Sequence, residues 1–251
     1  AYFDDLWLLR FLISAAARAS ASSSSDHIVA AAAAKLRPAL GFREKHAARL
    51  ASARDAARAA LAAGLPVRGP ALFNAIAEKF PAEYVPEAAR EGSGHAVFVY
   101  RLGRAFFGDI PALASSDELL DAFIWGSEAQ YAILDAESRA SGTLTRAVYV
   151  LDMADLALFG HRGFLNARFH RIQTAVSQHN EAHYPALLCT IVAVNVPWVA
   201  RQAARAIEAV APRFAGKVKV YENSTAGGED EDGKGRGDLA WRPYAERVLV
   251  V

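Results

Sequence analysis

Two uninterrupted apolar runs place the strongest constraint on the fold of this chain. Residues 147–151 read Ala-Val-Tyr-Val-Leu and lead into Asp152, and residues 187–195 form a second run of the same kind. Neither run alternates between apolar and polar residues, which is typical of strands that are buried on both faces of a sheet. Helical patterns at 163–179 and 198–210 alternate with them along the chain. The alternation predicts an α/β fold with a mainly parallel, mixed sheet flanked by helices.

The first part of the chain has the character of a helical region. Residues 2–19 predict a short amphipathic helix, and a serine-rich linker follows at 20–25. Ser25 or Asp26 is expected to cap the next helix, because short polar side chains accept hydrogen bonds from free N–H groups there. Residues 27–63 are rich in alanine and arginine, which gives them high helix propensity throughout.

The texture changes near residue 95. A short helix is predicted at 71–79, followed by an irregular stretch that contains Pro81 and Pro86. The β-branched and aromatic run at 95–102 then predicts the first strand, and Ser115-Ser-Asp-Glu118 fits a capping box before a further helix. Residues 217–221 alternate between polar and apolar and predict another strand.

These patterns predict three regions. Residues 1–90 form a helical N-terminal subdomain, residues 91–223 form the α/β domain, and residues 224–251 form an acidic, glycine-rich loop with a C-terminal segment.

Charge and cysteine content narrow the function classes. The formal net charge is +1, from 28 basic and 27 acidic residues, whereas nucleic-acid binding favours a strongly basic face. The single cysteine, Cys189, precludes a disulfide framework and indicates a reducing compartment. No apolar run reaches the ~18 residues of a bilayer span, and the N-terminus lacks a signal-peptide pattern. We therefore expect a cytoplasmic protein, no nucleic-acid partner, and peripheral membrane contact at most.

Catalytic motifs are absent from the sequence. There is no P-loop, no G-x-S-x-G and no G-x-G-x-x-G after a strand, so we expect neither an enzyme nor a cofactor. His179 and His183 have ligand spacing on a helix, but His-Asn-Glu-Ala-His departs from the metalloprotease pattern and predicts a solvated helix end without metal. Cys189 is interpreted as an inert core thiol, and Asp152 as a turn or capping residue in preference to a catalytic one.

Several short motifs occur in a fixed order along the chain. They are Leu8-Leu-Arg-Phe-Leu12, Phe42-Arg-Glu-Lys45, the strand from Gly94 to Gly103, Val148-Tyr-Val-Leu-Asp152, Tyr184-Pro185 followed by Asn195-Val-Pro197, and Lys217. In this order and spacing the chain resembles the CRAL-TRIO family of lipid-binding domains, which includes phosphatidylinositol-transfer proteins. The resemblance extends over residues 4–222.

The resemblance implies an internal apolar pocket with the sheet as its floor, helices as its walls and a mobile gate helix. The ligand implied is one phospholipid, with phosphatidylinositol as a candidate, or another hydrophobic molecule that a monomer exchanges at membranes. The alternative is a protein-interaction module on the same fold, without lipid transfer. The residues assigned to the pocket are Phe98, Tyr100, Tyr149 and Leu151; those assigned to the gate helix are Trp198, Val199, Ala203, Ile207 and Val210; and those assigned to the headgroup are Lys217 and Arg18.

Several positions depart from the family pattern for phosphatidylinositol. Ala186 stands where a glutamate follows the Tyr-Pro pair, and Ala15 and Ala16 stand where two basic residues follow the first motif, with Arg18 nearby. Small hydroxyl residues, which accompany phosphatidylcholine binding, are replaced at Ala147 and Tyr149 on the strand that ends in aspartate, and the tyrosine of the first strand is Phe98. The ligand therefore stays open among phospholipids, sterols and isoprenoids.

Overall fold

A computed structural model describes residues 5–20, 22–85, 94–156, 166–196 and 218–220. The chain divides into two compact units, each built from three separate segments. The helical unit comprises Ala1–Ala75, Pro111–Arg146 and Ala167–Leu187, and the sheet unit comprises Ile76–Ile110, Ala147–Asn166 and Leu188–Val251. The boundaries predicted at residues 90 and 223 lie outside the described residues and stay predictions.

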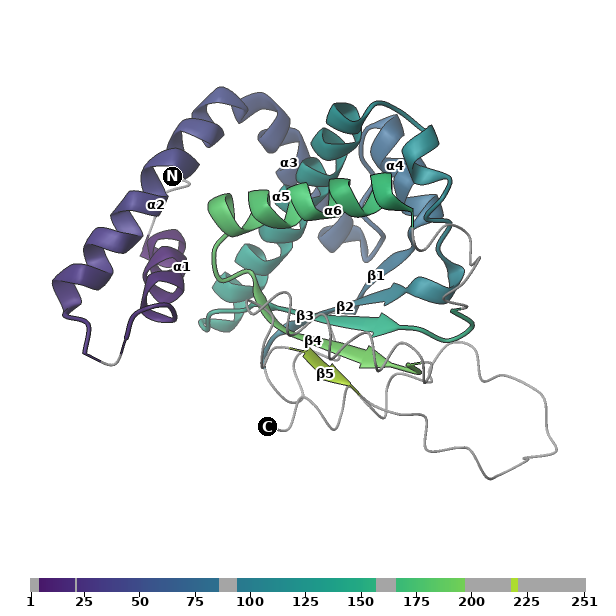
Figure 1. Cartoon of the computed structure of the whole chain (residues 1–251). Helices are drawn as coiled ribbons and strands as arrows, with labels where there is room; N and C mark the ends of the chain where they lie inside the picture. Colours follow the sequence, from purple (N-terminus) through teal and green to yellow (C-terminus); the bar gives the residue numbers. More distant parts are fainter. Residues whose placement is uncertain (1–4, 21, 86–93, 157–165, 197–217, 221–251) are drawn as a thin grey trace. The chain divides into compact units, whose positions relative to one another are not determined.

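Six α-helices are described, and all but the last turn of α4 belong to the helical unit (Figure 1). They are α1 (Asp5–Ala16), α2 (Ser25–Lys45), α3 (Ala47–Ala63), α4 (Ala71–Lys79), α5 (Ser116–Ser141) and α6 (Ala167–His183). Within this unit, α1 packs on α2, α2 packs on α6, and α5 packs on both α3 and α6. The predicted helix at 71–79 is confirmed at both ends.

The helical sequence at 27–63 forms two helices, and the first of them ends at Lys45, where the Phe42-Arg-Glu-Lys45 motif also ends. The backbone of His46 leaves helical geometry, with φ −114° and ψ 21°, and α3 starts at the next residue. No glycine or proline stands at His46 or next to it, and the helix propensity of the neighbouring residues is high. The cap of α2 is also one residue earlier than expected, because Ser24 accepts the hydrogen bond from the backbone N–H of His27.

The capping box at the start of α5 is confirmed. The backbone N–H of Glu118 donates to Ser115 Oγ at 3.3 Å, and the backbone N–H of Ser115 donates to Glu118 Oε2 at 2.9 Å. The helix ends at Gly142, whose φ of 68° lies in the left-handed region that glycine adopts without strain.

Five strands lie side by side in the order β1 to β5 (Figure 1). Strand β1 runs antiparallel to β2, and the remaining neighbours are parallel. The mixed, mainly parallel sheet of an α/β fold is thus confirmed. The strands are β1 (Ala82–Val85), β2 (Ala96–Arg101), β3 (Ala147–Asp152), β4 (Leu188–Val194) and β5 (Val218–Val220). The sequence did not predict β1, because Pro81 directly precedes it and favours an irregular stretch; proline is tolerated at such an edge.

One face of the sheet is a closed valine core, which we call the valine face. The six valines are no more than 2% exposed; five of them align with a valine or threonine of a neighbouring strand, and Val194 aligns with Asp152. β-branched side chains pack well on a pleated surface, and burial of each stabilises the fold by ~1.5–3 kcal/mol. The members are Val97 and Val99 of β2, Val148 and Val150 of β3, and Val192 and Val194 of β4.

Polar side chains join the carboxyl ends of β3 and β4. Asp152 Oδ1 accepts hydrogen bonds from the backbone N–H of Ala154 at 3.0 Å and from Asn195 Nδ2 at 2.8 Å. Asn195 has φ 54°, a conformation that asparagine tolerates better than most residues. The turn role predicted for Asp152 is confirmed.

Substitution of Gly103, which follows β2, tests how closely its backbone packs against that of Ala154. A Cβ at this position would lie 1.6 Å from the carbonyl oxygen of Ala154, so the backbone would have to move. We expect Gly103→Ala to lower the free energy of unfolding by about 1–3 kcal/mol, as overpacking typically does. Urea unfolding followed by circular dichroism measures the change.

The matched control is Gly41→Ala in α2, where nothing lies within 4 Å of the new Cβ. Alanine is the better helix former, so this variant should gain about 0.5–1 kcal/mol. Equal effects of the two substitutions would contradict the close approach of Gly103 to Ala154.

Candidate functional site

The four predicted pocket residues share one face of the sheet. Phe98 aligns with Tyr149 and Tyr100 with Leu151 across the β2–β3 pair, on the side opposite the valines. Their side chains therefore project from the same surface, because successive side chains alternate across a strand. The structure brings these four residues together, and their role in ligand binding stays a prediction.

Aromatic rings form a continuous series on this surface. Ring centroids are 5.3 Å apart for Tyr84 and Phe98, 6.2 Å for Phe98 and Tyr149, and 5.2 Å for Tyr149 and Tyr100. Phe80 continues the series 5.6 Å from Tyr100. Edge and tilted contacts of this kind are favourable for aromatic pairs. We call this surface the aromatic face; it consists of Tyr84, Phe98, Tyr100, Tyr149, Leu151 and Ile191.

The two faces of the sheet differ in charge. The charged residues of β1 to β4 are Glu83, Arg101 and Asp152, and their register places all three on the side of the valines. Arg101 and Glu83 form an ion pair there at 3.1 Å. Within these four described strands, the aromatic face therefore carries no Asp, Glu, Lys, Arg or His.

The two faces also differ in accessibility. Phe98 is buried, but Tyr84, Tyr100, Tyr149, Leu151 and Ile191 are only half-buried, in contrast to the closed valine face. An uncharged surface of large rings with accessible area is what an apolar ligand requires.

Of the predicted headgroup and gate residues, the structure describes only Arg18. Arg18 follows α1 in the helical unit, where its exposed guanidinium pairs with Glu181 of α6. Lys217 and the gate residues Trp198, Val199, Ala203, Ile207 and Val210 lie outside the described residues.

Lys35 of α2 is a basic residue that the sequence analysis did not select. Its Nζ donates to Ser14 Oγ at 3.1 Å, next to the positions Ala15 and Ala16 where basic residues were expected. Burial, followed by the charge of Arg18, lowers the pKa of Lys35. Only the pairing of α1 with α2 reveals this proximity, so no local signal in the sequence could have found it.

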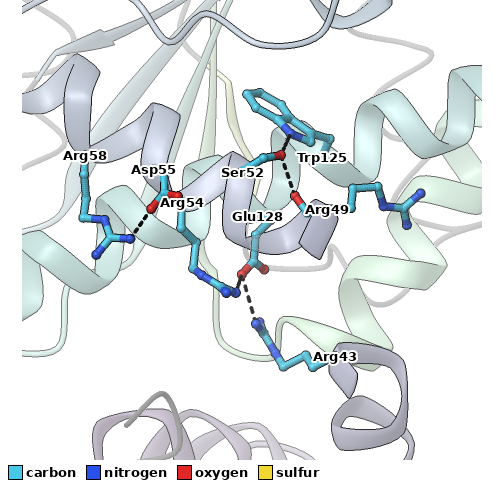
Figure 2. A network of polar contacts seen from close by, with 8 residues as sticks. All are labelled: Arg43, Arg49, Ser52, Arg54, Asp55, Arg58, Trp125 and Glu128. Carbon is cyan, nitrogen blue, oxygen red and sulfur yellow. Dashed lines mark hydrogen bonds and ion pairs between the residues drawn. The ribbon is translucent and has the colours of Figure 1, made fainter. Parts of the chain in front are cut away.

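A buried ionic centre joins the helices of the helical unit (Figure 2). Glu128 of α5 is fully buried, and its Oε1 accepts hydrogen bonds from Arg43 Nη1 of α2 at 3.0 Å and from Arg54 Nη1 of α3 at 2.8 Å. Arg43 is also buried, with 4% of its side chain exposed. We call these three residues the ionic centre.

Aromatic rings cover the cation of this centre. The guanidinium of Arg43 lies 5.5 Å from the ring centroid of Trp7, 5.3 Å from that of Tyr131 and 5.2 Å from that of Tyr184. Burial is the largest single effect and would lower the pKa of Arg43, but the interactions with Glu128, Tyr184 and Tyr131 together outweigh it and raise that pKa. Burial raises the pKa of both tyrosines, so they remain neutral beside the cation.

A second buried arginine extends the network to the end of α6. Arg10 of α1 donates to the carbonyl oxygens of Thr145 at 3.0 Å and Ala186 at 3.3 Å, and to Ser138 Oγ at 3.3 Å. Its guanidinium lies 5.4 Å from the ring centroid of Tyr131. Three of the family-like motifs, which contribute Arg10, Arg43 and Tyr184, therefore meet in the interior of the helical unit, where they hold helices together.

Metal-ligating groups and an open hollow are two further features of the described residues that bear on ligand binding. In the described part of the chain, no three His, Cys, Asp or Glu residues lie close enough to hold a metal ion. An open hollow of about 350 Å³ lies between α5 and α6, but Arg168 at its rim is bound to the carbonyl oxygens of Pro111 and Ala114. The hollow contains none of the predicted pocket residues.

Among the described helices, none is both long and apolar enough to cross a membrane.

The interpretation of His179 and His183 is wrong, whereas the surroundings of Cys189 agree with its interpretation as a structural thiol. His179 and His183 are half-buried against Phe42, so the predicted solvated helix end is wrong. The sequence could not show that α2 covers this side of α6. Cys189 is half-buried and packs against the valine face, as a structural thiol does.

The ionic centre makes a measurable contribution to stability. We expect Glu128→Gln to reduce the free energy of unfolding by about 3–5 kcal/mol, because it leaves the buried Arg43 charge without its carboxylate. Asp55→Asn is the matched control, since Asp55 pairs with Arg58 on the exposed side of α3 and exposed pairs contribute less than about 1 kcal/mol. Chemical denaturation that found equal losses would contradict the central role of Glu128.

Comparison with solved structures identifies a similar fold. The chain superimposes on the crystal structure of Sfh5 with a TM-score of 0.56 and 17% sequence identity. The match covers 87% of this chain and 66% of the Sfh5 chain, so the chain spans about two thirds of that protein's length. No protein-family model matches the chain, and no curated protein matches it in sequence. At this identity the likeness shows the fold, which is the mixed α/β arrangement that the motifs predict.

Proposed function

We propose that this chain binds a hydrophobic ligand, one phospholipid or a molecule of similar character, against the aromatic face of its sheet. The observation that carries the proposal is the division of the sheet into a closed, charged side and an accessible side of uncharged rings. The fold that the chain shares with Sfh5 and the ordered motifs support the same function.

Burial of an acyl chain supplies enough free energy for this function without covalent chemistry. Each buried CH₂ group contributes about 0.8 kcal/mol, so a chain of ordinary length gains on the order of 10 kcal/mol before the entropy of binding is subtracted. The rings of Tyr100 and Tyr149 offer large contact area at low conformational cost, because each has only two rotatable side-chain bonds. The proposed function is therefore binding and exchange, with no catalytic step.

Exchange requires that the ligand reach a bilayer. We assign this step to the segment that begins at Trp198, in which Val199, Ala203, Ile207 and Val210 recur at helical spacing. Trp198 is suited to a membrane interface, where indole rings lie among headgroups. In this proposal the protein acts as a cytoplasmic monomer that meets membranes peripherally.

The direct experiment is extraction of lipid from the purified protein followed by mass spectrometry. We expect about one hydrophobic ligand per chain in the parent protein. Tyr149→Ala should reduce the affinity for that ligand by about 10- to 100-fold, because loss of one well-packed ring contact costs roughly 1–3 kcal/mol. Titration with a fluorescent fatty acyl phospholipid measures the affinity.

The matched control is Leu65→Ala, which removes an apolar side chain that is 66% exposed in the helical unit. It should bind like the parent. A parent protein that carries no lipid and binds none would overturn the proposal and favour a protein-interaction role for the same fold. An unchanged affinity in a folded Tyr149→Ala protein would move the ligand away from the aromatic face.

Headgroup recognition is assigned to Lys217, on the basis of the family-like motifs. If the ligand is phosphatidylinositol, one charge-assisted hydrogen bond contributes about 1.5–3 kcal/mol. Lys217→Ala should then slow phosphatidylinositol transfer between vesicles by roughly one to two decades, while Lys219→Ala should transfer at the parental rate. Equal losses in both variants would indicate general electrostatic attraction in place of a specific contact.

A further inference from the structure

Three histidine rings surround Phe42 at the junction between α2 and α3. The centroid of the Phe42 ring lies 4.7 Å from that of His46, 4.6 Å from that of His179 and 4.6 Å from that of His183. The two α6 histidines are also in contact, with centroids 4.3 Å apart. This group, which we call the histidine cluster, is a main contact between α6 and the α2–α3 junction.

The cluster depends on long-range packing. His179 and His183 are one turn apart on α6, so both rings project toward the same neighbour. Phe42 lies near the end of α2, and His46 is the residue at which the helix breaks before α3. Apolar ring contacts therefore hold these elements together while the imidazoles are neutral.

The charges that face the cluster are mostly positive. Arg43 and Lys45 approach from α2 and Arg49 from α3, whereas Asp121 of α5 is already paired with Arg49. A protonated imidazole here would therefore meet other cations. It would also lose water on the half-buried side of its ring, which disfavours the charged form.

The pKa values follow from these surroundings. Burial first, and then the neighbouring His183 and Arg49, lower the pKa of His179 from 6.5 to about 4. Burial and Arg43 lower the pKa of His183, and burial and Arg49 lower that of His46.

We propose that the histidine cluster is a proton-sensitive latch, which holds α6 on the α2–α3 junction at neutral pH and loosens when the histidines are protonated. The latch lies wholly within the helical unit and does not depend on the proposed ligand. Since α6 leads directly into Tyr184, which covers Arg43, loosening also reaches the ionic centre.

The pH window follows from the direction of the shifts. The opened state binds protons at the ordinary pKa of 6.5, whereas the closed state binds them only at lower pH. The stabilisation is thus fully present above pH 6.5 and is lost progressively as the pH falls from 6.5 towards about 4. Histidine is the side chain best suited to sense this range.

Hydrogen exchange measured by mass spectrometry tests the latch, with labelling times corrected for the pH dependence of intrinsic exchange and with EDTA present. Between about pH 7.5 and about pH 5, the protection of α6 amides should fall roughly tenfold or more in the parent, since one unit of pKa shift corresponds to a tenfold change in the opening equilibrium. In the double variant His179→Gln/His183→Gln, which cannot be protonated at these positions, protection should fall less than about threefold.

The matched control is His27→Gln, an exposed histidine on α2 outside the cluster, which should behave like the parent. His46→Gln, at the edge of the cluster, provides a milder variant should the double variant unfold, and it should retain an intermediate pH response. The proposal is overturned if α6 protection in the parent is independent of pH over this range. It is equally overturned if a folded cluster variant loses as much protection as the parent.

Discussion

The pairing of Arg43 with Glu128 is the interaction on which the helical unit depends. Both groups are almost completely buried, and a buried charge is tolerated only when a partner and hydrogen bonds compensate for lost water. This requirement fixes the positions of α2 and α5 together, and Arg54 adds α3 to the same carboxylate. Arg10 extends the same requirement to α1, because its buried guanidinium donates hydrogen bonds to oxygen atoms of Ser138, Thr145 and Ala186.

In the sheet unit, organisation depends on register and not on charge. Because side chains alternate, the alignment of Val97 with Val148 also aligns Phe98 with Tyr149, and a shift of one residue would exchange the two faces. The valine core thus fixes the aromatic face indirectly. Substitutions on the valine side should disturb the aromatic side, even though the two sets of side chains lie on opposite surfaces.

Features encoded within a few residues could be predicted from the sequence, whereas features made by distant partners could not. The capping box of Ser115 and the strand that ends at Asp152 each follow from neighbouring residues, and both are confirmed. Helix propensity alone does not mark the break at His46, which directly follows the Phe42-Arg-Glu-Lys45 motif. Glu128 gave no signal, because a glutamate on a helix is ordinarily exposed, and only the positions of α2 and α3 bury it. The shared face of the pocket residues required the register of β2 with β3.

The two units use aromatic rings for opposite purposes. In the helical unit, Trp7, Tyr131 and Tyr184 lie around a guanidinium, where the negative faces of the rings stabilise a fixed charge. On the sheet, Phe98 and Tyr149 contact other rings, and no basic or acidic residue of β1 to β4 shares their face. Such a surface would hold a ligand through its buried apolar area and would not distinguish one headgroup from another, since hydrophobic burial is non-directional. In the proposed function, discrimination among ligands that share acyl or isoprenoid chains therefore comes from polar contacts with the headgroup, the role that the motifs assign to Lys217.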